Sequence, residues 1–517
     1  MSRNVTIFIV FLVVGVGGMV GAKYAIPYFQ GQHQKDTSDA KGTKGTINIG
    51  MDSWIGYFPL CSKDFKRRMR NTGYLIKCQD DKADYGARFK ALEKGDLQFA
   101  VATLDSYLLG GKEFGYPGTV ISVIDESKGG DGIVSRKDKV KSLDELKSQD
   151  GLKVAFTPAS PSEFLLKATS VHFDIASLRK GGNATMIEAD GSEDALDKLK
   201  SGDADVAVLW EPDLTRAREQ QDFKVLLSSK DTTKLIVDVL LVSRQYAKEN
   251  PELVHTFLRN YFRTLKTYRD DRDRLRQEVE RETQLKTKQV QAMLSGVRWV
   301  TLRENAMAWF GVQMAGQMSR EDIVDSLESS VDILVDAGTI TESPLPGENP
   351  YVILNRGFVE ELFTKGVGGF KNSAQGAAQA QKSFKALSSS AWDQMAEVGT
   401  LKIRPITFQS GTGSLSDEGQ DQLKKAASAL KHYPNFRVVI KGHTGLRGDA
   451  DANRQLSQSR AESVLNYMVS SLSQDQNRLR AVGFGADQPL KRMPGESNRS
   501  YQYRLPRVEL YLVSEVY

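Results

Sequence analysis

Aromatic, carboxyl and hydroxyl side chains gather where three predicted strands end. Residues 52–59 (DSWIGYFP) follow the first strand, residues 157–162 (TPASPS) join a strand to a helix, and Trp210 ends the run DVAVLW. Ligands of open α/β sheets bind outside the carboxyl ends of the strands, so these loops are expected to converge. Hydroxyl groups and free backbone N–H groups at a helix start favour an anionic ligand group. The sequence therefore predicts a binding site for a small molecule.

The candidate ligand contacts are Trp54, Tyr57, Ser127, Ser160, Trp210 and Asp238. Trp54 and Trp210 could equally be core side chains, because large aromatic residues are mostly buried. Asp238 lies in the apolar run LIVDVLLVS, where an unpaired carboxylate would be costly. It therefore needs a partner, which is a ligand, a backbone amide or a residue of a hinge. Glu211 is either a turn residue or a further contact.

Motifs for catalysis are missing from the sequence. It contains no Gly-x-x-x-x-Gly-Lys phosphate loop, no His-Glu-x-x-His and no Gly-x-Ser-x-Gly elbow. No two of the five histidines are close enough to suggest a metal pair. The two cysteines, Cys61 and Cys78, are too few for a disulfide-dense scaffold or a four-cysteine zinc site. We therefore expect no enzyme activity, no metal and no cofactor.

Residues 5–22 (VTIFIVFLVVGVGGMVGA) carry no charge and lack the polar stripe of a soluble helix. As a helix they would span ~27 Å, close to the ~30 Å hydrocarbon core of a bilayer. The length favours a single-pass inner-membrane anchor over a signal peptide cut after Val20-Gly21-Ala22. The absence of an ionisable group argues against a proton-driven motor subunit. In either case the bulk of the chain is expected in the periplasm, where Cys61 and Cys78 could form a disulfide.

The composition describes a folded protein of several domains. The 517 residues are 40% apolar and 26% charged, which excludes a wholly disordered chain. A net charge of +5 over this length is too small to indicate a nucleic-acid partner. At ~100–200 residues per domain, the length allows roughly three to four domains.

Strand-like and helix-like stretches alternate in two regions, which predicts an α/β fold with covered sheets. We expect an anchor or signal at 1–29, a polar linker at 30–45, an α/β region at 46–370, a spacer at 371–400 and a second α/β region at 401–517. Residues 251–335 are predicted as helix throughout, and residues 403–408 (IRPITF) as the first strand of the last region.

The last region resembles the OmpA-like peptidoglycan-binding family. The motifs that carry the resemblance are Ile406-Thr407-Phe408, Ser410-Gly411, Gly442-His443-Thr444, Asn453, Leu456-Ser457, Arg460-Ala461, Gly483-Phe484-Gly485 and Arg507-Val508-Glu509. The resemblance implies a small α/β domain that grips the diaminopimelate of wall peptides. It implies that Arg460 pairs with the ligand carboxylate, which suits a planar guanidinium.

This region departs from the family at two recognition positions. The family places Asp directly after Gly-His-Thr to receive the ligand ammonium, whereas this chain has Gly445. Asp449 is a candidate substitute in the same loop, and Asn453 keeps the family register. The family's Asn-Arg-Arg stretch reads Leu505-Pro506-Arg507 here. Wall binding is therefore expected to be weaker, altered or lost.

Residues 46–365 resemble the periplasmic solute-binding proteins of nitrate, sulfonate, taurine and thiamine-precursor uptake. The resemblance rests on the strand-end loops together with Asp125-Glu126-Ser127, Gly130-Asp131-Gly132 and Asp238. It implies two lobes around a cleft, with the chain crossing between them near Ser127 and returning near Lys234.

Together these observations predict an envelope-anchored periplasmic binding protein that captures a small solute and attaches to peptidoglycan. The expected partners are the solute, peptidoglycan, the cytoplasmic membrane and either a transporter permease or an envelope protein. The alternative is a structural tether between membrane and wall, in which the solute-binding fold is a ligand-free docking scaffold.

Overall fold

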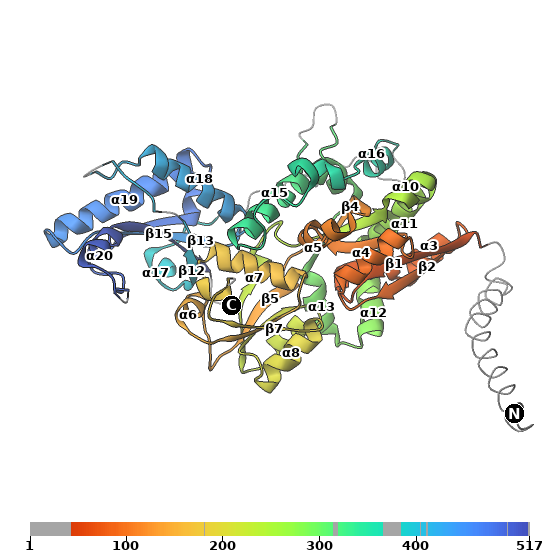
Figure 1. Cartoon of the computed structure of the whole chain (residues 1–517), viewed down its shortest axis with the longest axis horizontal. Coiled ribbons are helices and arrows are strands. Elements are labelled where there is room, and N and C mark those ends of the chain that lie inside the picture. Colours follow the sequence, from red (N-terminus) through yellow and green to blue (C-terminus); the bar gives the residue numbers. More distant parts are fainter. Residues whose placement is uncertain are drawn as a thin grey trace, which may run out of the picture.

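The computed structural model describes residues 43–179, 181–313, 319–365, 384–403, 405–409, 412–493 and 495–514. The apolar segment at residues 5–22, most of the expected linker and residues 371–383 of the expected spacer lie outside these ranges. Within them, no helix combines the length and the apolar character needed to cross a bilayer. The described residues form three sheets of six, five and four strands (Figure 1).

The six-stranded sheet, with the helices packed on it, is called the first lobe. Its order is β11-β4-β10-β3-β1-β2, and β10 runs antiparallel to both of its neighbours. Buried apolar side chains fill its central strands. The strands are β1 (Gly45–Met51), β2 (Tyr74–Asp80), β3 (Phe99–Thr103), β4 (Gly118–Ser127), β10 (Val237–Ser243) and β11 (Val297–Trp299). The helices are α2 (Phe58–Cys61), α3 (Lys63–Arg70), α4 (Tyr85–Lys94), α5 (Leu104–Gly110), α10 (Arg244–Glu249), α11 (Pro251–Asp270), α12 (Arg272–Thr283), α13 (Thr287–Ser295), α14 (Leu302–Glu304), α15 (Asp322–Asp336) and α16 (Gly357–Thr364).

The prediction of helix throughout residues 251–335 is wrong at β11. Val297–Trp299 instead adds a strand to the edge of β4, pairing Val297 with Ser127 and Trp299 with Asp125. The reason is that an open strand edge offers backbone partners, which a short segment with β-branched and aromatic side chains can use.

The five-stranded sheet and its helices form the second lobe, with the order β7-β6-β8-β5-β9. Its strands are β5 (Asp131–Arg136), β6 (Lys153–Phe156), β7 (Thr185–Glu188), β8 (Val206–Trp210) and β9 (Phe223–Ser228). Its helices are α6 (Leu143–Ser148), α7 (Pro161–His172), α8 (Ser192–Ser201) and α9 (Asp213–Arg218). The chain crosses from β4 to β5 directly after Ser127 and returns from β9 to β10 through residues 229–236, close to the expected positions.

The two crossings are bonded to each other. Ser127 Oγ lies 2.7 Å from Ser229 Oγ, and Lys128 Nζ donates to the carbonyl of Thr232 at 2.6 Å. The buried carboxylate of Glu126 accepts from the backbone N–H of Lys234 at 2.6 Å. These bonds hold the two crossings together, and the two crossings are here called the hinge segments (residues 127–131 and 229–236).

The four-stranded sheet and its helices form the C-terminal domain, with the order β12-β15-β13-β14. Its strands are β12 (Ala396–Leu401), β13 (Arg437–His443), β14 (Leu479–Gly483) and β15 (Arg507–Ser514), and its helices are α17 (Ser389–Asp393), α18 (Asp417–Lys431), α19 (Ala450–Ser470) and α20 (Asn498–Arg504). The predicted strand at residues 403–408 is wrong. The first strand is β12, which begins inside the expected spacer, and Phe408 makes an isolated bridge to Leu415. Pro405 explains the difference, because proline cannot donate a ladder hydrogen bond.

A disulfide joins Cys61, at the end of α2, to Cys78 on β2. The sequence left this pairing open. The bond closes a loop with a sequence separation of 17 residues. A loop of this length is expected to contribute about 3 kcal/mol by restricting the unfolded chain.

The C-terminal domain packs on the hinge segments and on α7 of the second lobe. His432, at the end of α18, accepts from Thr233 N through its carbonyl oxygen at 2.7 Å, and its Nδ1 lies 3.0 Å from the Thr233 carbonyl. Its Nε2 lies 2.7 Å from Ser329 Oγ on α15. The ring of His432 stacks on that of His172, whose Nδ1 lies 2.6 Å from the hydroxyl of Tyr433. One histidine therefore touches the hinge, α7 and α15 together.

This interface is expected to weaken as the pH falls. Burial, with a smaller contribution from the neighbouring His432, lowers the pKa of His172 to about 3. Burial also lowers the pKa of His432, with Lys234 and Lys431 adding to the effect and the Thr233 carbonyl and Glu126 opposing it. A base whose pKa is lower in the folded than in the unfolded protein loses stability as the pH falls below its unfolded pKa of ~6.5. His172 alone should cost about 2 kcal/mol between pH 7 and pH 5.

Urea denaturation at pH 7 and pH 5 checks this expectation. The variant His172→Gln keeps a hydrogen-bonding group for Tyr433. Its loss of stability between pH 7 and pH 5 should be smaller than that of the wild type by about 2 kcal/mol. His255→Gln is the control, since His255 bonds to Glu361 away from the interface. Equal pH dependence in wild type and His172→Gln would contradict the expectation.

Candidate solute-binding cleft and wall-binding surface

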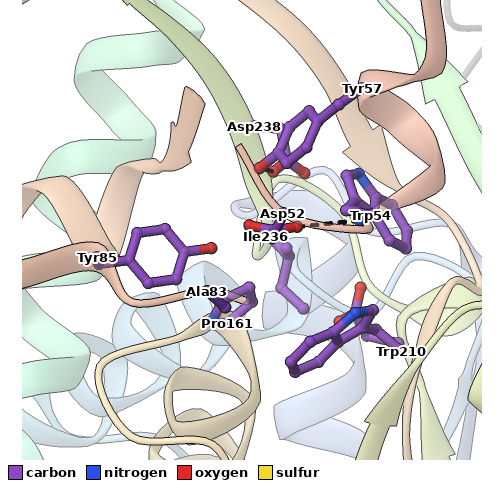
Figure 2. A pocket seen from close by; sticks show the side chains of 10 residues that line it. Asp52, Trp54, Tyr57, Ala83, Tyr85, Pro161, Trp210, Ile236 and Asp238 are labelled. Carbon is purple, nitrogen blue, oxygen red and sulfur yellow. Dashed lines mark hydrogen bonds between the residues drawn. The ribbon is translucent and has the colours of Figure 1, made fainter. Parts of the chain in front are cut away.

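A small cavity of about 20 Å³, enough for a water molecule, lies between the two lobes. Figure 2 shows the rings and carboxyl groups that surround it. It is lined by Asp52, Trp54, Tyr57, Ala83, Tyr85, Asp131, Pro161, Trp210, Ile236 and Asp238. Both lobes contribute: the loops after β1 and β2 and the start of β10 from the first, and the starts of β5 and α7 and the end of β8 from the second. The predicted candidates Trp54, Tyr57, Trp210 and Asp238 therefore lie around one space.

Asp52 is fixed by two donors on the first-lobe wall of the cavity. One oxygen accepts from the backbone N–H of Trp54 at 3.0 Å, and the other accepts from Arg88 at 3.0 Å. Arg88 is fully buried and also donates to Asp81 and to the carbonyl of Val101. Asp52 is thus paired with a guanidinium whose other bonds run to Asp81 and to the carbonyl of Val101.

Asp238 has the partner that its apolar strand requires. Tyr57 donates its hydroxyl to Asp238 Oδ1 (Figure 2). Asp125 lies opposite Asp238 in the β4–β10 ladder and accepts from the indole N–H of Trp54 at 3.2 Å. Burial raises the pKa of Asp125 to about 8. Burial and then the charge of Asp125 raise the pKa of Asp238 well above its usual value. The pair therefore holds a proton at neutral pH.

The second lobe supplies Asp131 and the indole of Trp210. Asp131 begins β5 and pairs in register with Trp210 at the end of β8. Burial raises the pKa of Asp131 to about 7, and the nearby carboxylate of Glu211 adds to this effect. Its charge at neutral pH therefore depends on what occupies the cavity.

Ser127, Ser160 and Glu211 do not line the cavity. Ser127 is buried in the hinge against Ser229. Ser160 caps α7, where its hydroxyl donates to the carbonyl of Thr157 and accepts from Ser162 N. Glu211 accepts from Thr215 and Arg218, and so braces the turn before α9. These side chains position the cavity walls and do not face its space.

The sequence reasoning did not select Asp52, Tyr85 or Asp131 as ligand contacts. Asp52 begins the quoted loop after the first strand, and Asp131 belongs to the quoted motif Gly130-Asp131-Gly132, but neither was named as a contact. Tyr85 opens α4 directly after a turn, which resembles an ordinary helix start and gives no signal of a site.

The C-terminal domain presents Arg460 on α19 without a carboxylate partner among the described residues. Its guanidinium lies 5.2 Å from the ring centre of Phe408, and Nε is 3.4 Å from the carbonyl of Thr412. Partial burial lowers the pKa of Arg460. A half-buried guanidinium without an acidic partner is suited to receive a carboxylate.

The other predicted wall contacts have structural bonds. Asp449 caps α19 by accepting from Ala452 N at 2.9 Å, and Asn453 donates to the carbonyl of Arg447 at 3.1 Å. His443 is buried, stacks on Phe484 and lies 3.3 Å from Glu509. A Cβ built on Gly445 would meet no atom within 4 Å. This position is therefore open, and Asp449 does not fill it.

Comparison with known families agrees with both resemblances. Residues 407–502 match the OmpA family. Residues 82–285 match the family described as ABC transporter, phosphonate, periplasmic substrate-binding protein. One segment of the chain is thus similar to the OmpA family, and an earlier segment is similar to the substrate-binding family. The two resemblances expected from the sequence are thereby confirmed.

Curated relatives match the C-terminal domain. They include a probable lipoprotein YiaD of Escherichia coli, 35% identical over 85 residues, which are 16% of this chain and 38% of that protein. Outer membrane protein Omp38 of Acinetobacter baumannii is 31% identical over 112 residues, which are 22% of this chain and 31% of that protein. A peptidoglycan-associated lipoprotein of Rhizobium meliloti is 32% identical over 85 residues, covering 16% and 48%. The matched residues thus span less than half of the length of each of these relatives.

Solved structures resemble the two lobes at low identity. The alkanesulfonate-binding protein SsuA from Xanthomonas axonopodis pv. citri has a TM-score of 0.44 and 14% identity, covering 57% of this chain and 94% of that one. A ligand-binding component of an ABC-type import system from Staphylococcus aureus has a TM-score of 0.47 and 12% identity, covering 62% and 98%. Neither value is high enough to say which ligand this chain binds.

Replacing Gly130 should push the lobes apart at the hinge. A Cβ at Gly130 would lie 2.2 Å from Cη2 of Trp54. Gly130→Ala should therefore destabilise the protein by about 1–3 kcal/mol, the usual cost of overpacking. Thermal unfolding of the full chain measures this change. Gly86→Ala is the control, because its nearest atom would be 3.6 Å away and alanine favours its helix α4. Equal melting temperatures for the two variants would argue against a tight contact at Gly130.

Proposed function

We propose that the protein is an envelope-anchored binding protein, which captures a small solute between its lobes and attaches to peptidoglycan. One observation carries the solute-binding part: aromatic and carboxyl side chains from both lobes enclose a single cavity beside the two chain crossings. The fold by itself would not support the proposal of solute binding, because one fold serves many functions.

Lobe closure is the proposed mechanism of capture. Trp54 and Tyr57 are held on the first lobe by Asp125 and Asp238, and Trp210 stands on the second. A solute that touches both sides gains contacts in the closed arrangement only, and so shifts the population towards it. The bonded hinge segments would carry this motion.

Wall attachment is proposed for the C-terminal domain. The support is the match to the OmpA family and the guanidinium of Arg460, which has no acidic partner among the described residues. Gly445 leaves the expected acceptor for the ligand ammonium empty. We therefore propose a weaker grip on wall peptides than an Asp at this position would give, with Asn453 and Asp449 shaping the loop.

The sequence and the two families support a location in the cell envelope. We propose a single-pass inner-membrane anchor within residues 1–29, formed by the apolar run at residues 5–22, with the remainder in the periplasm. The bond between Cys61 and Cys78 suits an oxidising compartment. A permease or another envelope protein would be the partner that reads solute occupancy. No catalytic step is assigned to the cleft.

A ligand-free tether is the second candidate. Docking of His432 and Tyr433 against the hinge and α7 favours it, because such a contact would also make a stiff spacer between membrane and wall.

A thermal-shift screen of the full chain separates the two candidates. The panel should include nitrate, sulfonates, phosphonates, amino acids, amines and pyrimidines. A ligand at 100 times its Kd should raise stability by ~2.7 kcal/mol. The gain should disappear in Trp210→Ala and persist in Trp392→Ala, which changes a tryptophan of α17 in the C-terminal domain. A panel without any shift would support the tether.

Co-sedimentation of the full chain with purified peptidoglycan tests the wall contact. Arg460→Ala should weaken pelleting by about ten-fold or more, since hydrogen bonds to charged groups contribute about 1.5–3 kcal/mol. Gly445→Asp should strengthen it by supplying the missing carboxylate in open space. Arg454→Ala is the matched control on α19, where Arg454 pairs with Asp487. Equal pelleting of Arg460→Ala and wild type would remove Arg460 from the site.

A further inference from the structure

We propose that the cleft between the lobes selects a small organic cation, an alkyl or quaternary ammonium, and rejects the anions that the family description suggests. This inference rests on the proposed solute-binding function and names the ligand class of the same cavity.

The charged side chains that line the cavity are all acidic. They are Asp52, Asp131 and Asp238, and no Lys or Arg belongs to the lining among the described residues. Arg88 lies behind Asp52, but its donors are directed to Asp52, Asp81 and the Val101 carbonyl. A phosphonate or sulfonate entering this space would meet carboxyl groups and no cationic side chain of the lining, which is unfavourable in a buried site.

A wider groove leads to the same place and carries the same sign of charge. It shares Asp52 and Trp210 with the cavity and is lined by seven carboxyl side chains but by only two basic ones, Lys82 and Arg216. Arg216 is paired with Asp213 at 2.7 Å, and Lys198 and Lys200, which lie outside the lining, pair with Asp194 and Asp197; the groove keeps an excess of carboxyl groups. A groove of one charge sign raises the local concentration of the opposite ion, so this entrance attracts cations.

The rings supply the second half of a cation site. Trp54, Tyr57, Tyr85 and Trp210 all line the cavity; in Figure 2 Tyr85 lies on the left and the other three rings lie on the right. A cation within ~6 Å of an aromatic face is attracted by the negative face of the ring. Rings and methyl groups also exclude water, which favours an alkylated ammonium over an inorganic ion. The combination of faces and carboxyl groups is therefore chemically specific for an organic cation.

The buried carboxyl groups give binding a pH signature. Burial raises the pKa of Asp131 to about 7 and of Asp125 to about 8. The groups that face Asp131 are Ser127, Glu211, Asp105 and Asp52. A bound cation stabilises the ionised carboxylates, so binding must release protons and become tighter from pH 6 to pH 8. An anion would show the opposite dependence.

Isothermal titration of the full chain with chosen probes tests the proposal. The cations are tetramethylammonium and ethylammonium, the neutral probe is tert-butanol, which has nearly the shape of tetramethylammonium, and the anions are methylphosphonate and ethanesulfonate. At least one cation should bind ten-fold or more tightly than tert-butanol. Its affinity should rise several-fold from pH 6 to pH 8, with proton release seen as a buffer-dependent heat.

Two variants locate the binding. Asp238→Asn keeps an acceptor for Tyr57 and Asp131→Asn removes the second-lobe carboxyl, and each should weaken cation binding about ten-fold or more. Asp64→Asn is the matched control, because Asp64 is equally buried but bonds to Arg67 and Arg68 on α3 and does not line the cavity. Circular dichroism and melting temperature confirm that each variant is folded.

The outcomes separate this inference from the proposed function. Tight binding of an anion that is lost in Trp210→Ala would overturn the cation assignment and leave solute capture standing. Cation binding that is equal in Asp238→Asn, Asp131→Asn and wild type would place it outside the cleft and overturn the assignment. No binding of any probe, together with no hit in the thermal-shift panel, would overturn both.

Discussion

The buried pair Asp125 and Asp238 is the constraint around which the cleft is built. Two carboxyl groups face each other across β4 and β10 in the middle of an apolar sheet, where a pair of charges would be very costly. They are tolerated because they retain a proton and because Trp54 and Tyr57 donate to them. The same bonds aim both rings at the space between the lobes. The demand for hydrogen-bond partners thus fixes the first-lobe wall of the cavity.

The hinge segments depend on another buried carboxyl group of β4, which also has hydrogen-bond partners. Glu126, next to Asp125, is buried but ionised, because Lys128, Arg298 and the N–H of Lys234 outweigh its burial and lower its pKa. Neighbouring carboxyl groups on β4 therefore differ in state: Asp125 belongs to a pair that holds a proton, whereas Glu126 is charged at the crossing. This difference follows from their partners, since both side chains are buried. The charged Glu126 keeps the hinge segments bonded to each other. The carboxyl groups at the cavity can instead gain or lose a proton when a charged ligand binds.

Part of this arrangement could be predicted from the sequence. Strand-end loops rich in aromatic residues do meet at one cavity, because the ends of neighbouring strands share an edge, and Asp238 did need a partner. Hydroxyl groups at the start of α7 suggested an anion, but Ser160 is occupied by its own cap and the cavity is lined by carboxyl groups instead. Pairing between distant strands, which buries Asp125 opposite Asp238, cannot be seen in local patterns. The docking of His432 on His172 was equally hidden, since each is a lone histidine in sequence.

Docking and wall binding use different parts of the C-terminal domain. His432 and Tyr433 follow α18 and contact the hinge and α7, whereas Arg460 lies on α19 beside Phe408. The domain can therefore keep its contact with the lobes while Arg460 holds a ligand. Because His432 bonds to Thr233 of the returning crossing, a change in the hinge on lobe closure must alter this interface. Solute capture and the position of the wall-binding surface would then be linked through one backbone segment, and by reciprocity a wall-bound domain would bias the lobes.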